Sequence, residues 1–260
     1  MDLKLQGKRA LVSGANRGTG QVIAQILAAE GAVVIVHGPD KDACAETMAL
    51  LPDTAICAPG DLETDAGADQ VMAQAGAVDI LIANLGGAAP AKWGKLPSEE
   101  WLTIYNQNVL TAVRLIDRTR PHMEAQNWGR IIGLSTIGTL IPNKVMPHYY
   151  ASKGAMQTMF GSLAKDLLGK GVAVNLVAPG LIATAEVIAA YCARAKRKGQ
   201  PDDWASVEKA LATQEMPTAS GRLTTREEVA ALVAFLSSPL SDAVSGTSIR
   251  VDGGASGLAI

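Results

Sequence analysis

The chain has 260 residues, 48% of them hydrophobic, and a formal net charge of −2 at neutral pH. Its length fits one large α/β domain or two small ones. The mixed charge provides no basic face for nucleic acid, and no apolar run reaches the ~20 residues that span a bilayer, so we expect no nucleic-acid or membrane partner. The first residues lack the basic and then apolar profile of a signal peptide, which predicts a cytoplasmic protein.

Apolar runs and helical segments alternate along the whole chain. Apolar or β-branched runs predict strands at residues 9–12, 32–36, 54–57, 78–83, 130–134, 172–177 and 248–251. Helical patterns predict helices at residues 21–30, 40–51, 63–75, 98–126, 149–168 and 225–236. Ser98 is a plausible N-cap of the fourth helix, and residues 185–220 follow no regular pattern.

This alternation predicts an α/β fold, a doubly wound (Rossmann) parallel seven-stranded sheet flanked by helices, in a single domain over residues 1–260. Ligands of such sheets bind beyond the carboxyl ends of the strands. The loops that follow the strands should therefore carry the chemistry. Cys44, Cys57 and Cys192 lack the spacing of metal ligands, and we expect them to be reduced and structural.

The loop after the first strand contains three glycines at a spacing that suits phosphate binding. Gly14 permits a tight turn, Gly18 lets the backbone approach a pyrophosphate, and Gly20 lets the next helix pack closely on the strand. The N-terminus of that helix offers unpaired N–H groups to the phosphates. The loop therefore predicts a dinucleotide site.

A second motif opens the helix predicted at residues 149–168. Tyr149 and Lys153 are four residues apart, so they lie on one helical face. A nearby ammonium lowers the pKa of a phenol from its usual value of about 10. Hydride transfer to or from a carbonyl carbon needs such a proton donor and acceptor at the oxygen. Tyr150 lies one residue off this face and is interpreted as a bystander.

The pattern G-x-x-x-G-x-G, with Tyr149 and Lys153 downstream, resembles the classical short-chain dehydrogenase/reductase family over about residues 6–254. The resemblance implies that Tyr149 is the catalytic acid/base and that Lys153 also binds the nicotinamide ribose. The family has a serine thirteen residues before the tyrosine, where this chain has Thr136, preceded by Ser135. Both remain candidates to hold the substrate oxygen. Asn108, seven residues after a tryptophan, matches an asparagine that supports a proton-relaying water.

The resemblance also implies a set of residues around the nicotinamide dinucleotide. With Tyr149 and Lys153, they are Gly14, Asn16, Arg17, Gly18, Thr19, Gly20, His37, Asp61, Leu62, Asn84, Gly86, Pro179, Gly180, Ile182 and Thr184. Asp61 either accepts a hydrogen bond from the adenine amino group, caps the helix that follows, or does both. Thr19, Ala83 and Leu85 depart from the family pattern beside the phosphates and the ribose.

The end of the second strand bears on the choice of cofactor. An acid there would bind a ribose 2′-hydroxyl and repel a 2′-phosphate, but the strand ends in Val36, His37, Gly38 and Pro39. Arg17, with Lys41 nearby, is placed to attract the phosphate, although the arginine often found at the position of Pro39 is missing. NADP(H) is therefore preferred, and NAD(H) is possible.

Together these features predict an NADP(H)-dependent alcohol dehydrogenase or carbonyl reductase acting on a ketone or secondary alcohol. The alternatives are a 3-oxoacyl reductase of acyl-carrier-protein or coenzyme A substrates, and a dinucleotide-binding sensor impaired in catalysis. The apolar helices at 98–126 and 149–168, and the habit of the family, predict a homotetramer.

Residues 185–220 are expected to form a substrate lid. In this segment Val187, Ile188, Tyr191, Trp204 and Met216 either line the substrate or pack within the lid. The basic run Arg194, Lys196, Arg197 and Lys198 is either a solvated helix end or a contact for an anionic carrier.

Overall fold

One parallel sheet organises the molecule. The computed structural model describes residues 1–257, in which seven strands pair in the order β3-β2-β1-β4-β5-β6-β7. They are β1 (Arg9–Val12), β2 (Val33–Val36), β3 (Ile56–Cys57), β4 (Ile80–Ala83), β5 (Gly129–Leu134), β6 (Val172–Pro179) and β7 (Ser248–Val251). The strand order reverses at β1 and β4, which confirms the doubly wound sheet and places its switch point between these two strands.

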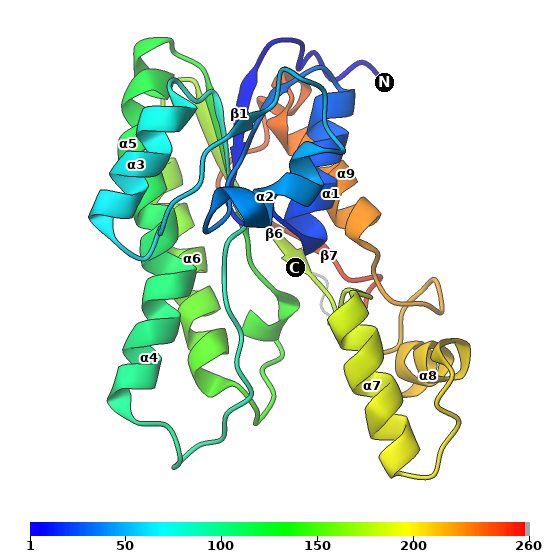
Figure 1. The fold of residues 1–260 in the computed structure, drawn as a ribbon. Coiled ribbons are helices and arrows are strands. Elements are labelled where there is room, and N and C mark those ends of the chain that lie inside the picture. Colours follow the sequence, from blue (N-terminus) through cyan, green and yellow to red (C-terminus); the bar gives the residue numbers. More distant parts are fainter. Residues whose placement is uncertain (258–260) are drawn as a thin grey trace.

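Helices cover both faces of this sheet (Figure 1). On one face lie α1 (Gly18–Ala29) and α9 (Arg226–Ser237), which also contact each other. On the other lie α3 (Asp65–Ala75), α5 (Thr111–Ala125) and α6 (Pro147–Asp166). The short helix α2 (Lys41–Met48) packs beside β2 and β3. None of the helices within residues 1–257 is long and apolar enough to cross a membrane.

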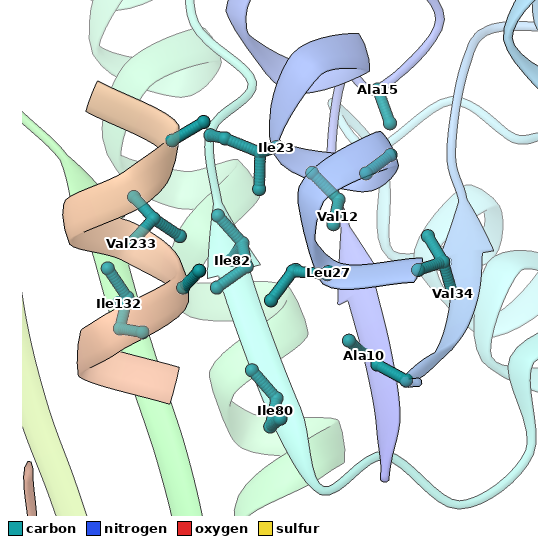
Figure 2. Close-up of a cluster of buried hydrophobic side chains, with 14 of the residues drawn as sticks. Ala10, Val12, Ala15, Ile23, Leu27, Val34, Ile80, Ile82, Ile132 and Val233 are labelled. Carbon is teal, nitrogen blue, oxygen red and sulfur yellow. The ribbon is translucent and has the colours of Figure 1, made fainter. Parts of the chain in front are cut away.

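The strands are apolar on both sides, because each side packs under a helical layer. Figure 2 shows Val12 of β1, Ile82 of β4 and Val233 of α9 in the cluster between the sheet and the α1–α9 layer. The intervening residues Leu11 and Leu81 belong to the cluster on the opposite face. Since neighbouring side chains of a strand point to opposite faces, these runs are continuously apolar. Polar side chains are therefore expected at the ends of the strands, outside the two helical layers.

The long helix predicted at residues 98–126 is divided in the structure. It consists of α4 (Ser98–Tyr105), a π-helical turn at Asn106–Leu110, and α5. The prediction that Ser98 caps this helix was wrong: Pro97 occupies the cap position in extended backbone, and Ser98 is the first helical residue. The third strand is also shorter than predicted, two residues instead of four.

The segment 185–220 is more regular than its sequence indicates. It contains α7 (Ala185–Arg197), α8 (Trp204–Ala210) and a π-helical turn at Leu211–Glu215, and it extends away from the sheet (Figure 1). These helices build their own small core, against which Tyr191, Trp204 and Met216 pack. The pattern was hard to recognise because Gly199 and Pro201 separate two short helices.

Two smaller predictions concern the basic run at the end of α7 and the three cysteines. The cationic side chains of Arg194, Lys196 and Arg197 lie in the last turn of α7, where positive charge is favourable, and Arg194 pairs with Glu215. The cysteines pack in apolar clusters: Cys44 and Cys57 in the cluster on the α1–α9 face of the sheet, and Cys192 in the core formed by α7 and α8. Within the described residues all three are free thiols.

Candidate active site

A cleft of about 840 Å³ opens at the carboxyl ends of β1, β2, β3 and β4. It brings together the residues that the sequence assigns to the phosphate and adenosine parts of a dinucleotide. They are Gly14, Asn16, Arg17, Gly18, Thr19, Gly20, His37, Asp61, Leu62, Asn84 and Gly86. The segments that supply them lie far apart in the chain, and the crossovers of the parallel sheet place them side by side.

The N-terminus of α1 faces this cleft. Its N-cap is Arg17, and within the described residues neither a side-chain cap nor an acid in the first turn satisfies its N–H groups. Gly18 adopts a φ of +61°, in the left-handed region that favours glycine. At Gly20 a Cβ atom would lie 2.6 Å from Asn84 Nδ2, so only glycine lets the helix approach so closely. The uncapped N–H groups and the helix dipole form an anion site.

Ser13 and Asn84 join the loops after β1 and β4. The buried Ser13 Oγ accepts hydrogen bonds from the backbone N–H groups of Asn84 and Leu85, both at 3.0 Å, and donates to the Ile82 carbonyl. The Asn84 amide donates to the carbonyls of Ser13 (2.9 Å) and Gly14 (3.1 Å). Asn84 therefore fixes the glycine loop in addition to lining the cleft.

His37 makes a similar connection on the other side of the glycine loop. Its Nδ1 accepts a hydrogen bond from Gly14 N–H at 3.0 Å, so its Nε2 carries the proton and donates to the Gly60 carbonyl at 3.0 Å. Burial lowers the pKa of His37, which keeps the imidazole neutral at neutral pH. His37 thus ties the loops after β1, β2 and β3 together at the wall of the cleft.

Asp61 lies on the adenosine side of the cleft, where its carboxylate accepts the Glu63 N–H at 2.9 Å. It does not cap the following helix. That cap is Thr64, whose hydroxyl accepts the Gly67 N–H at 3.0 Å. The alternative of Asp61 as an N-cap was therefore wrong, because α3 begins two residues later than predicted.

A smaller pocket of about 180 Å³ continues from the cleft. Thr19, Asn84 and Gly86 line both spaces. Around the small pocket the fold adds Ser135 from the end of β5, Tyr149 and Lys153 from α6, and Pro179 and Ile182 from the end of β6. The predicted acid–base pair therefore lies at the end of the predicted dinucleotide cleft.

The amide of Asn108 holds the loop that borders Lys153. Asn108 is fully buried in the π-helical turn, where its Oδ1 accepts the Gly87 N–H at 2.8 Å and its Nδ2 donates to the Gly87 carbonyl and to Ser152 Oγ. A Cβ at Gly86 would lie 2.6 Å from Asn108 Oδ1 and 3.2 Å from Lys153 Nζ. Asn108 thus positions the backbone of Gly86 and Gly87, which lies beside Lys153.

Burial dominates the titration of the acid–base pair. It raises the pKa of Tyr149 to about 12, an effect that a hydrogen bond with the Thr136 side chain partly offsets. It lowers the pKa of Lys153 to about 8. Lys153 Nζ donates to the Leu134 carbonyl at 2.7 Å. The sequence predicts that the ammonium lowers the pKa of Tyr149; in this structure the loss of hydration outweighs any such effect.

The two candidate hydroxyls have different surroundings. Ser135 is 7% exposed and lines the small pocket, and its Oγ has no hydrogen-bond partner among the described residues. Thr136 Oγ1 accepts the Gly138 N–H at 3.1 Å and so caps a short 3-10 turn at Ile137–Thr139. The Thr136 side chain thus bonds both Gly138 N–H and Tyr149, whereas Ser135 Oγ is buried without a hydrogen-bond partner among the described residues.

Tyr150 makes contacts that helical spacing did not predict. Its ring packs edge-on against Tyr149, with centroids 5.4 Å apart, and its hydroxyl accepts a hydrogen bond from Asn143 Nδ2 at 2.8 Å. A Cβ at Gly138 would collide with this ring. Burial raises the pKa of Tyr150, and the phenol of Tyr191 on α7 adds to the effect. Tyr150 therefore lies between the loop after β5 and the lid.

Gly180 and Thr184, which the resemblance also places at the cofactor, make contacts within the protein. Gly180 packs against Asp252 and donates its N–H to the Val251 carbonyl, and Thr184 caps α7 by accepting the Val187 N–H. Glu186, which no motif singled out, also lines the large cleft. Within residues 1–257, no group of three His, Cys, Asp or Glu side chains is arranged to hold a metal ion.

Comparisons with known proteins agree with this geometry. The profile of the family described as "Enoyl-(Acyl carrier protein) reductase" matches residues 14–256. The chain is 36% identical to the uncharacterized oxidoreductase YvaG of Bacillus subtilis, and the alignment covers 98% of each chain. It is 30% identical to the 3-oxoacyl-[acyl-carrier-protein] reductase FabG of Vibrio harveyi, over 97% of this chain and 98% of the relative.

Among solved structures the fold is similar to that of L-sorbose reductase from Gluconobacter frateurii, determined with NADPH and L-sorbose. The TM-score is 0.91, the sequence identity is 28%, and both chains are covered completely.

The depressed pKa of Lys153 leads to a prediction about stability. In the folded protein this lysine titrates at about 8 instead of 10.5, so between these values the unfolded chain binds more protons. The stability of the wild type should therefore rise as the pH increases from about 8 to about 10. Replacing Lys153 with methionine removes this contribution. The difference in unfolding free energy between variant and wild type should change by roughly 1–3 kcal/mol over this range.

Urea unfolding at several pH values checks this prediction. Lys165→Met, which replaces an exposed lysine of the same helix, is the control and should show no such change. Parallel pH profiles for Lys153→Met and the wild type would contradict the lowered pKa.

Proposed function

Because this chain belongs to the short-chain dehydrogenase/reductase family, we propose that it is an NADP(H)-dependent oxidoreductase that acts on a ketone or secondary alcohol. One observation carries the proposal. Tyr149, Lys153 and the unbonded hydroxyl of Ser135 line one small pocket, which continues into a cleft with an uncapped helix N-terminus. The pocket thus offers a proton donor and a hydrogen-bond donor beside a phosphate-binding cleft.

The residues present fit a nicotinamide dinucleotide. The N-terminus of α1 would hold the pyrophosphate, Asp61 and Leu62 border the adenosine side, and Pro179 and Ile182 border the nicotinamide side. Lys153, which lines the small pocket, would bind the ribose hydroxyls. When bound, the nicotinamide supplies or accepts the hydride.

Each of the protein's own groups has a defined task in this chemistry. Tyr149 gives a proton to the substrate oxygen during reduction and takes one during oxidation, which balances the hydride at carbon. Ser135 Oγ donates a hydrogen bond to the same oxygen and so holds the carbonyl toward Tyr149. Asn108 fixes the loop at Gly86 and Gly87, which keeps the lysine end of the pocket narrow.

Two features support NADP(H) over NAD(H). No carboxylate side chain extends from the end of β2. Gly38 there is closely packed: a Cβ would lie 2.8 Å from Cys44 Sγ and 2.9 Å from Asn16 Cβ. An acid that repels a 2′-phosphate is therefore sterically excluded at this position. Arg17 supplies positive charge to the cleft.

The substrate class rests on the structural relative and on Tyr150. L-sorbose reductase acts on a hydroxylated ketone, and here Tyr150 and Asn143 place a phenol and an amide close to Tyr149. Hydroxylated ketones are therefore the first substrates to test, with α7 and α8 as the lid. The 30% identity to FabG keeps 3-oxoacyl thioesters as the second candidate.

We further propose a homotetramer. On the α5–α6 pair, a shallow depression of about 480 Å³ has a mixed lining. Its apolar residues are Val113, Ile116, Met159 and Leu163, and its polar residues are Asp117, Arg120, Ser162 and Asp166. A second subunit would cover the apolar part of this surface.

Steady-state assays test the function directly. NADPH oxidation should proceed with hydroxylated and simple ketones, and NADH should be the poorer cofactor. The panel should include 3-oxoacyl thioesters of coenzyme A and of acyl carrier protein. Turnover of thioesters alone would favour the second candidate, and tight NADPH binding without turnover of any compound would indicate a sensor.

Replacing Tyr149 with phenylalanine removes the proton donor but keeps the ring that packs against Tyr150. We expect kcat to fall by about 10²-fold or more, the size of a general acid–base contribution. NADPH affinity, measured by fluorescence titration, should stay within about threefold of the wild type. A rate within threefold of the wild type would refute the assigned role.

Alanine at Ser135 and at Thr136 should have different consequences. Ser135→Ala should lower kcat by about tenfold or more, because the substrate oxygen loses a hydrogen bond in a buried pocket. Thr136→Ala should lower the melting temperature, because Gly138 N–H loses its bond to Oγ1, and should lower kcat less than Ser135→Ala, through the lost hydrogen bond with Tyr149. A larger loss of kcat in Thr136→Ala than in Ser135→Ala would reverse the assignment.

A further inference from the structure

The large cleft has an unusual balance of charge for a site that receives phosphates. Among the described residues that line it, Arg17 is the single strong cation, and three residues are acids: Asp61, Glu63 and Glu186. Asp61 accepts its neighbour's N–H, and the carboxylate of Glu63 accepts a hydrogen bond from Gln107 at 3.0 Å. These two acids belong to the adenosine wall and are held by their own surroundings.

Glu186 belongs to a different wall. It is exposed in the first turn of α7, which begins six residues after the end of β6, and it lines the same cleft as Arg17. Arg17 is itself exposed, at the N-cap of α1. Hydrogen bonds with its own backbone N–H and with Thr184 lower the pKa of Glu186, and the charges of Arg17 and Arg226 lower it further. The carboxylate is therefore ionised at neutral pH and is attracted to Arg17.

A phosphate of the dinucleotide and the carboxylate of Glu186 would thus both be attracted to Arg17. We propose that Glu186 is a specificity-determining residue of the cleft, which competes with the 2′-phosphate of NADP(H) for Arg17 and so reduces the preference for NADP(H) over NAD(H). This inference rests on the proposed function, since it concerns the cofactor of the same site. NAD(H) lacks the 2′-phosphate, so it gains less when the competing carboxylate is removed.

The experiment compares the affinities of NADPH and NADH for the wild type and for Glu186→Gln, by titration of the reduced nicotinamide fluorescence. The substitution keeps the size of the side chain and removes its charge. We expect NADPH to bind about fivefold more tightly to the variant, and NADH to change by less than about twofold. The gain should shrink as salt is raised, because the side chains involved are exposed.

Two further variants separate this effect from a general change of charge. Glu227→Gln replaces another exposed acid in the first turn of a helix, α9, that does not line the cleft within the described residues. It should leave the NADPH/NADH affinity ratio unchanged. In an Arg17→Gln background, Glu186→Gln should no longer raise this ratio, because the cation for which the two anions compete is gone.

The outcomes distinguish the inference from the function on which it rests. If the wild type binds NADPH and NADH but Glu186→Gln leaves the affinity ratio unchanged, the inference is wrong and the proposed function stands. An equal gain with and without Arg17 would also overturn it, because Glu186 would then act by simple repulsion. If a folded wild type, verified by its melting curve, binds neither dinucleotide, both proposals fall together.

Discussion

The buried hydroxyl of Ser13 and the amide of Asn84 form the connection on which the rest of the site depends. Together they bond the loop after β1 to the loop after β4, at the point where the strand order of the sheet reverses. This connection sets the glycine loop beside Gly86, and Asn108 fixes the next residue from the opposite side. The phosphate cleft and the small catalytic pocket are continuous for that reason, sharing Thr19, Asn84 and Gly86.

Burial gives the small pocket its chemical character. It takes water away from a phenol and an amine, which disfavours the charged form of each: the pKa of Tyr149 rises and that of Lys153 falls. A neutral phenol is a competent proton donor to a carbonyl oxygen. The unbonded Ser135 hydroxyl provides a second polar contact in the same space. A buried polar group without a partner is costly, which is why the proposed function gives this hydroxyl a ligand partner.

The chain after β6 contributes to both spaces. Pro179 and Ile182 line the small pocket, and Glu186, in the first turn of α7, lines the large cleft. The helices α7 and α8 pack on their own small core, away from the sheet.

The sequence by itself determined the alternation of strands and helices, the glycine loop, the Tyr149–Lys153 pair and most residues of the cleft. These features depend on local periodicity and on spacing within single loops, which a linear sequence records directly. Tertiary structure alone showed how the surroundings of Ser135 and Thr136 differ: the Thr136 side chain bonds Gly138 N–H and Tyr149, whereas Ser135 Oγ has no partner among the described residues. It also decided the cap at Pro97, the helices of the lid, the bridging role of His37, and the positions of Tyr150 and Glu186. The positions of His37, Tyr150 and Glu186 depend on contacts between segments distant in the chain, and no local pattern encodes such contacts.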